Sequence, residues 1–129
     1  MGLDLASKTD IASAVFLFRE EVDGLDHYTA ISKNYVPESA VQKPENAHYQ
    51  AWVNAGHLIV TPGNMIDLAQ IQDDLLDEAS SIIIREVAKD PWGGQQLGAT
   101  LANEGFTVVD IPQQVRFMSE PMKIGRAHV

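Results

Sequence analysis

Three β-like runs, separated by short polar breaks, occupy the first third of the chain. They cover residues 2–7, 11–20 and 28–32, and the turn-forming pair Asp23-Gly24 separates the last two. Short apolar runs bounded by turn residues are typical of strands, and short turns favour antiparallel pairing. This stretch therefore predicts an antiparallel three-stranded meander.

Apolar residues recur at helical spacing in the middle of the chain. Pro37 is tolerated in the first turn of a helix, and Pro44 prevents that helix from continuing. The expected elements here are a short helix from Pro37, a helix over residues 45–56, a brief strand over 57–61, and a helix over 64–79 with Asn64 as its N-cap.

Strand and helix patterns alternate in the last third. Ile82-Ile83-Ile84 is expected to form the core of a buried strand over residues 82–89, which stops before Pro91. A helix is expected over 94–104 and a last strand over 106–111. A meander followed by strand–helix–strand crossovers predicts an α/β fold in which helices flank a mixed sheet.

The composition fits one small globular domain of 129 residues. Hydrophobic residues make up 45% and charged residues 21% of the chain, and no apolar run approaches the length of about 20 residues that spans a bilayer. The N-terminus lacks the basic and apolar regions of a signal peptide. Cysteine is absent, which excludes disulfides and a thiolate metal site.

The net charge of −9 opposes nucleic-acid binding, because long-range electrostatics repel a polyanion. Carboxylates that bind a divalent cation count as negative until the metal arrives, so a metal site would offset part of this charge. A basic face formed by residues of the last third, such as Lys89 and Arg116, would offset more. The charge still argues against tight, unaided binding of DNA.

Two carboxylates occupy positions that can bind a metal ion. Asp4 lies within the first apolar strand, where an unpaired charge is expensive to bury, and Asp90 directly follows the strand over 82–89. If these strands are neighbours, both side chains converge at one edge of the sheet, and such oxygen ligands suit Mg²⁺ or Mn²⁺. By position alone a second interpretation stays open, in which Asp4 caps a turn and Asp90 is a strand-end loop residue.

A series of short motifs resembles the nuclease domain in the terminase large subunit of tailed bacteriophages. The run Gly2-Leu-Asp-Leu-Ala-Ser7, followed by Asp10, resembles the opening strand of that domain. Each motif is weak alone, but the series follows the order and spacing of the family over residues 2 to about 123. The later motifs are Tyr35-Val-Pro-Glu38, Trp52-Val-Asn-Ala-Gly56, Thr61-Pro-Gly-Asn-Met-Ile-Asp67, Asp90-Pro-Trp92 with Gln95-Gln-Leu97 and Leu101-Ala-Asn-Glu-Gly105, Gln113-Gln114, and Met118-Ser-Glu-Pro-Met-Lys123.

The resemblance implies an RNase H-like fold and a metal-dependent endonuclease that cleaves concatemeric viral DNA. Carried over by motif, Asp4 and Asp90 are the metal-binding and catalytic residues of a two-ion site for Mg²⁺ or Mn²⁺. The implied partners are double-stranded DNA, the terminase ATPase motor domain, the small terminase subunit and the portal protein. The implied location is the cytoplasm of a bacterial host cell, and no membrane is expected as a partner. The contexts Asp90-Pro-Trp and Thr61-Pro-Gly argue against an unrelated RNase H-like junction resolvase.

The chain also departs from the family pattern. It has no Gly-x-x-x-x-Gly-Lys-Ser/Thr phosphate-binding loop, so it carries no ATP-driven motor. The third metal-ligating aspartate of the family lies beyond the Met-Ser segment, whereas no acidic residue follows Glu120 here. The expected nuclease domain therefore covers residues 1–123 and is incomplete at its C-terminus, and residues 124–129 form a tail that need not be native. The alternative function is a catalytically incomplete prophage remnant or a docking module for packaging proteins.

Several further residues have both a functional and a structural interpretation. Asp10 either supports the site or shapes a turn, and Asp67 either supports the site or favours a helix N-terminus. Trp92 either packs or helps to orient Asp90, and Gln95 either reaches a phosphate or is solvated. DNA contacts are expected from Lys89, Arg116 and Lys123. The acidic residues Asp73, Asp74, Asp77 and Glu78 are expected to form a solvated helix face.

Overall fold

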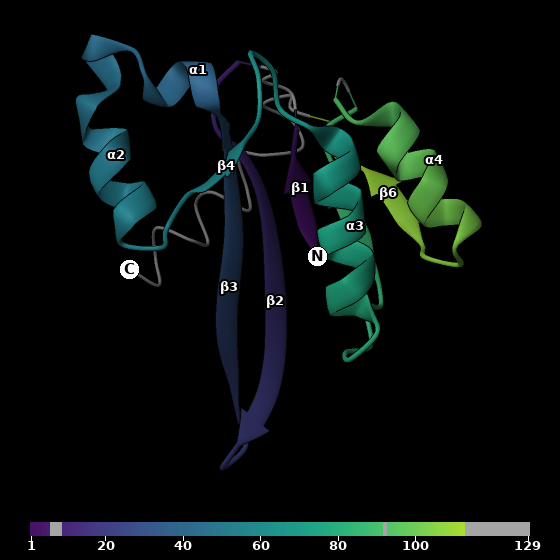
Figure 1. The fold of residues 1–129 in the computed structure, drawn as a ribbon. Coiled ribbons are helices and arrows are strands. Elements are labelled where there is room, and N and C mark those ends of the chain that lie inside the picture. Colours follow the sequence, from purple (N-terminus) through teal and green to yellow (C-terminus); the bar gives the residue numbers. More distant parts are fainter. Residues whose placement is uncertain (6–8, 92, 113–129) are drawn as a thin grey trace.

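Six strands form one mixed sheet in the computed structural model, in the order β4-β3-β2-β1-β5-β6 (Figure 1). The structure describes residues 1–5, 9–91 and 93–112. Strands β1, β2 and β3 pair antiparallel, and the pairs β1–β5, β5–β6 and β3–β4 are parallel. The strands are β1 (Gly2–Asp4), β2 (Ala12–Val22), β3 (Leu25–Pro37), β4 (Ile59–Thr61), β5 (Val87–Lys89) and β6 (Val108–Asp110).

Within the described ranges, four α-helices and one 3-10 helix connect these strands. They are α1 (Glu38–Val41), the 3-10 helix Pro44–Asn46, α2 (Ala47–Asn54), α3 (Leu68–Ala79) and α4 (Gln95–Asn103). The order of elements confirms the expected meander followed by strand–helix–strand crossovers, and thus the α/β fold. None of the described helices is long and apolar enough to cross a membrane.

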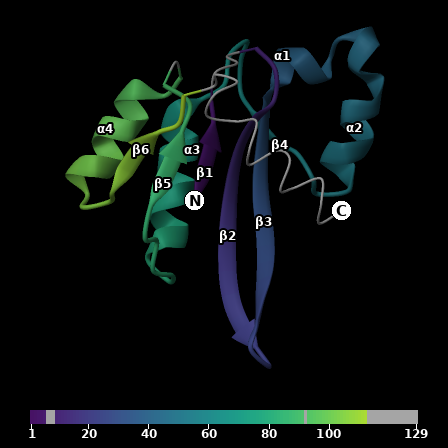
Figure 2. The ribbon, with the colours of Figure 1, turned by 180° about the vertical axis from the view of Figure 1, so that it is seen from behind.

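The helices lie on both faces of the sheet, over different strands. On one face, α3 and α4 bury Ile71, Leu75, Leu97 and Leu101 in a core cluster that includes Leu3 of β1. On the other face, α1 and α2 pack against the end of β3 in a second cluster of Val36, Ala40, Tyr49 and Leu58. α3 lies in front of the sheet in Figure 1 and behind β5 in the reverse view of Figure 2, so it covers one face of the sheet.

The β2–β3 hairpin extends far beyond the rest of the sheet (Figure 1). Its strands pair from Ala12↔Tyr35 to Val22↔Leu25, whereas β1 pairs with β2 only as far as Val15. The predicted turn at Asp23-Gly24 is confirmed, and both residues have positive φ, 53° and 78°. Such a two-residue turn matches the right-handed twist of its flanking strands.

Two predicted elements differ from the structure. Residues 82–86 do not form a strand, because neither neighbouring strand, β1 or β6, extends alongside them; only Val87–Lys89 pairs, and Ile83 is 92% exposed. Asn64 is not the N-cap of α3. Asp67 is, since its Oδ1 accepts hydrogen bonds from Ala69 N (3.0 Å) and Gln70 N (3.2 Å), where a carboxylate also favours the positive end of the helix.

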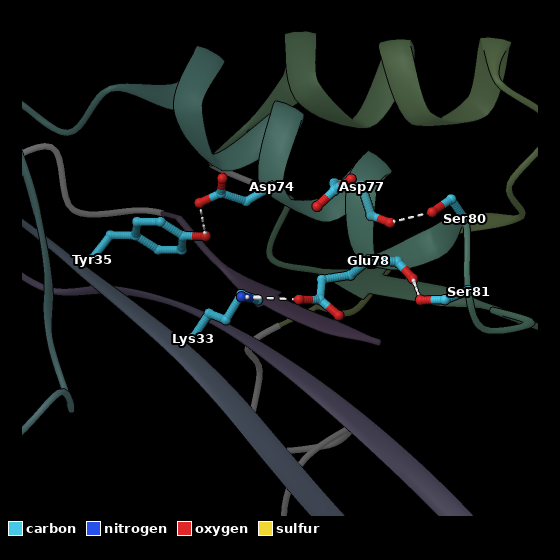
Figure 3. A network of polar contacts seen from close by, with 7 residues as sticks. All are labelled: Lys33, Tyr35, Asp74, Asp77, Glu78, Ser80 and Ser81. Atoms are coloured by element: carbon cyan, nitrogen blue, oxygen red, sulfur yellow. Dashed lines mark hydrogen bonds and ion pairs between the residues drawn. The ribbon is translucent and has the colours of Figure 1, made fainter.

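A polar network ties α3 to β3 (Figure 3). The hydroxyl of the fully buried Tyr35 donates to Asp74 Oδ2 at 2.8 Å, and Lys33 Nζ lies 3.2 Å from Glu78 Oε1. The expectation of a uniformly solvated acidic face is therefore wrong for Asp74 and Glu78, which face the sheet. Burial, and then the hydrogen bond to Asp74, raise the pKa of the Tyr35 phenol above its ordinary value.

Tyr35→Phe should lower the free energy of unfolding by about 1 kcal/mol at neutral pH, because a half-buried carboxylate loses its donor. The raised pKa also predicts a pH effect. The stability that the protonated phenol contributes is complete below its unfolded pKa of about 10 and is lost as pH rises above it. Urea unfolding between pH 8 and 11 should show a shallower alkaline loss for Tyr35→Phe than for the parent. Tyr28→Phe, at an exposed tyrosine, is the control, and equal alkaline slopes for all three proteins would contradict this account.

Candidate active site

The parallel pairing of β1 with β5 brings Asp4 and Asp90 together. The register joins Gly2 to Ala88 and Leu3 to Lys89. Asp4 is the last residue of β1, and Asp90 directly follows β5. Continued by one residue, the register sets Asp4 level with Asp90 on neighbouring strands, which lie about 4.8 Å apart in a sheet.

Both carboxylates line one hollow of about 310 Å³ at this end of the sheet. Leu3 packs into the core with α3 and α4, so the alternation of side chains along β1 directs Asp4 to the opposite face. Asp4 is exposed, and Asp90 is half-buried. The hollow is lined by Gly2, Leu3, Asp4, Ser13, Val15, Ala88, Lys89, Asp90 and Ile111.

Ser13 contributes a hydroxyl that the sequence did not single out. It is the β2 partner of Asp4, and its Oγ donates to Asn34 Oδ1 on β3 at 2.7 Å. Antiparallel partners project to the same face of a sheet, which explains why Ser13 lines the hollow beside Asp4. Only the register between β1 and β2 could have identified it, and that register depends on the length of the connection.

Lys89 has a structural role that contradicts the expected DNA contact. Its side chain is 7% exposed, and its Nζ lies 2.7 Å from Asp110 Oδ1 on β6. The same ammonium donates to the main-chain carbonyl of Asp90 at 3.2 Å. The stem occupies the space next to Gly98 of α4, where an added Cβ would lie 2.8 Å from Lys89 Cε. Lys89 thus anchors the end of β5 that carries Asp90.

Asp10 and Asp67 lie outside the hollow, and their described contacts are structural. Asp10 Oδ1 accepts hydrogen bonds from Ile11 N (2.9 Å) and from the hydroxyl of Tyr49 (2.8 Å), which ties α2 to the start of β2. The bond from the hydroxyl, followed by burial, raises the pKa of Tyr49. Asp67 is the N-cap of α3 described above. For both residues the structure supports the structural interpretation.

Of the remaining predicted residues, Gln95 belongs to the described part of the chain. Gln95 is exposed at the start of α4, and its Nε2 donates to the carbonyl of Pro91 at 3.1 Å. Gln95 therefore supports the loop that follows Asp90. Trp92, Arg116 and Lys123 lie outside the described residues.

The site offers oxygen donors of the kind that hard divalent cations prefer. Asp4 and Asp90 supply carboxylates, and Ser13 supplies a hydroxyl. Across residues 1–5, 9–91 and 93–112, no group of three or more His, Asp or Glu side chains is placed to hold a metal ion. Among these described residues the hollow presents two carboxylates, whereas the family resemblance implies three.

Lys89→Met should lower the free energy of unfolding by about 1–2 kcal/mol. The variant keeps an aliphatic stem of similar length but removes the Lys89 ammonium from Asp110 and from the Asp90 carbonyl. The half-exposed Asp110 recovers part of the loss from water. Arg85→Met removes an exposed cation from the loop before β5 and should change stability by less than about 0.5 kcal/mol. Urea unfolding measures both, and equal stabilities would show that the ion pair does not anchor β5.

Comparisons with known proteins agree on the family and the fold. A sequence model of the family described as "Terminase large subunit, endonuclease domain" matches residues 1–129. Protein YmfN of Escherichia coli (strain K12) is 32% identical over 131 residues, which cover 95% of this chain and 29% of YmfN. The crystal structure of the HK97 bacteriophage large terminase superposes with a TM-score of 0.70 at 24% identity, over 91% of this chain and 25% of that one. The sheet and helices thus confirm the expected RNase H-like fold. The chain spans less than a third of the length of either protein. Because the family model matches the whole chain, the chain belongs to the family of terminase large-subunit endonuclease domains.

Proposed function

We propose that this chain is a metal-dependent DNA endonuclease domain that hydrolyses phosphodiester bonds at the hollow between β1 and β5. One observation carries the proposal. Asp4 and Asp90 end two adjacent parallel strands and line the same hollow, on the face of the sheet opposite α3 and α4. The family membership supports the same activity.

The donor set fits Mg²⁺ or Mn²⁺, which Asp4 and Asp90 would hold. When bound, such ions activate a water molecule and stabilise the leaving oxygen of a phosphodiester. The two carboxylates come from neighbouring strands of a sheet, so their main chains are fixed relative to each other before any ion arrives. Lys89 adds to this by holding the carbonyl of Asp90 from the buried side.

The shape of the hollow admits a bulky substrate. Gly2 has no side chain, and a Cβ added there would meet nothing within 4 Å, so the floor of the hollow stays open. Within the described part of the chain, the helices on this face, α1 and α2, pack over β3 and not over β1 or β5. The helices of the described residues therefore leave both carboxylates uncovered for a DNA backbone.

Electrostatics set a limit on substrate binding. A chain with a net charge of −9 repels DNA, and two carboxylates in the hollow add to the repulsion locally until cations offset them. Few counterions are released when such a surface meets DNA, so binding should be weak at physiological salt. In the whole packaging protein, we propose that the ATPase motor domain, the small terminase subunit and the portal protein bring concatemeric DNA to this site in the bacterial cytoplasm.

A second function, a docking module without catalysis, is favoured by a different observation. The described residues place only two carboxylates in the hollow, and a two-ion site commonly uses more ligands. In that case the fold would bind packaging proteins and leave cleavage to another domain. An activity assay separates the two functions.

The nuclease proposal predicts weak, sequence-nonspecific nicking of supercoiled plasmid in millimolar Mn²⁺, with less in Mg²⁺ because Mn²⁺ binds such sites more tightly. Asp4→Ala and Asp90→Ala should each reduce nicking more than about tenfold, since even residues that only support a metal ligand commonly cost 10–100-fold. Gel electrophoresis of relaxed and supercoiled plasmid measures the rate.

Asp73→Ala is the matched control, because Asp73 is an exposed carboxylate on α3, remote from the hollow. It is a better control than Asp74→Ala, since Asp74 accepts the hydrogen bond of Tyr35. Asp73→Ala should cut as the parent does. Parent-like cutting by the Asp4 and Asp90 variants would trace the activity to a contaminant. A parent that is inert both alone and when extended past Val129 would favour the docking function.

A further inference from the structure

The projecting part of the β2–β3 hairpin, residues 16–31, carries a surface that the proposed nuclease does not use (Figure 1). We propose that this hairpin arm docks a partner protein that presents an apolar side chain beside a cluster of basic residues. The arm and the nuclease hollow share no lining residue, so the proposal stands apart from the proposed function.

Large apolar side chains are concentrated on the arm. Six of the ten exposed large hydrophobic residues in the described part of the chain belong to it, including Leu25 at 67%, Tyr28 at 61% and Leu17 at 60% exposed. A two-stranded ribbon is marginally stable by itself, and contiguous exposed apolar surface usually marks an interaction site. The strands of the arm also have no strand partner on their outer edges among the described residues.

The register shows that both faces of the arm are apolar near its base. Leu17 pairs with Ala30 on one face, and Phe18 pairs with Thr29 on the other. Directly opposed residues of antiparallel strands project to the same face. A partner can therefore contact the arm from either side.

A hollow of about 680 Å³ lies where the arm leaves the sheet. It is bounded by residues 16–19 of β2 and by residues 82–86 of the loop before β5, where Ile83 is 92% exposed. Of its charged groups, Arg19 is paired with Asp26, its Nη2 lying 2.8 Å from Asp26 Oδ1, and the Met1 ammonium donates to the carbonyl of Glu86 at 2.8 Å. Phe18 and Ile83 line this hollow and are exposed, so they offer contacts to an apolar side chain of a partner beside the polar groups that share the lining.

The tip of the arm is acidic, and this charge selects the partner. Glu20, Glu21 and Asp23 form no ion pair among the described residues, whereas Asp26 offsets Arg19. The tip therefore repels DNA and also the tip of a second copy, but it attracts basic side chains. With a rise of about 3.3 Å per strand residue, Glu21 lies about 13 Å from Leu17. The partner must present its basic cluster at that distance from its apolar side chain.

The test uses the 129-residue chain and an 18-residue helical peptide of leucine and lysine, labelled for fluorescence anisotropy. A peptide with glutamate in place of lysine and a labelled DNA duplex are the comparison ligands. The lysine peptide should bind, the glutamate peptide should not, and the weak binding of the duplex at the nuclease hollow should not change when the arm is altered. Leu17→Ser with Tyr28→Ser should weaken binding about tenfold, as expected for the loss of two contact side chains. Glu20→Gln with Glu21→Gln should weaken it to a similar extent.

Asp73→Asn with Asp77→Asn makes the same change of charge on the exposed face of α3 and should leave binding unchanged. Thermal melting checks that each variant is folded. Equal weakening by the α3 variant would show that the peptide responds only to net charge and would overturn the proposal. If the DNA duplex binds and Leu17→Ser abolishes that binding, the proposal is overturned in favour of a DNA-binding arm. A dimer seen by light scattering that Leu17→Ser dissociates would identify a second copy as the occupant instead.

Discussion

The parallel pairing of β1 with β5 is the interaction on which the site depends. β1 has only three residues, yet it lies inside the sheet, between β2 and β5, and the main chain of Met1 accepts a hydrogen bond from Ala88 N at 2.8 Å. Leu3, 6% exposed, anchors the strand in the core shared with α3 and α4. Any shift of this register by one residue would turn Asp4 into the core and away from Asp90.

The sequence predicted the features that local patterns determine. The order of strands and helices, the turn at Asp23-Gly24 and the α4 helix each follow from short-range periodicity and turn chemistry, and the structure confirms them. The proximity of Asp4 and Asp90 was predictable from the family resemblance together with the expectation that their strands are neighbours. Their role as metal ligands stays a prediction.

Features set by long-range packing were not predictable. Ile82-Ile83-Ile84 is apolar enough for a buried strand, but no neighbouring strand extends to pair with it, so it borders the hollow at the base of the hairpin arm. Lys89 was read as a surface charge, whereas its stem lies against Gly98 and its ammonium meets Asp110, a contact that only the β5–β6 register creates. The N-cap was expected at Asn64, because Asn and Asp are equally good capping residues by type, whereas the structure has Asp67 there, in agreement with its expected preference for a helix N-terminus.

Anomalous diffraction from crystals of the chain soaked in millimolar MnCl₂ tests the central claim most directly. If Asp4 and Asp90 form one cation site, an anomalous difference peak should lie in the hollow between β1 and β5, within about 2.0–2.4 Å of a carboxylate oxygen from each residue. The same peak should vanish in crystals of Asp4→Asn. A map without a peak in the hollow, or carboxylates directed to opposite faces of the sheet, would contradict the account.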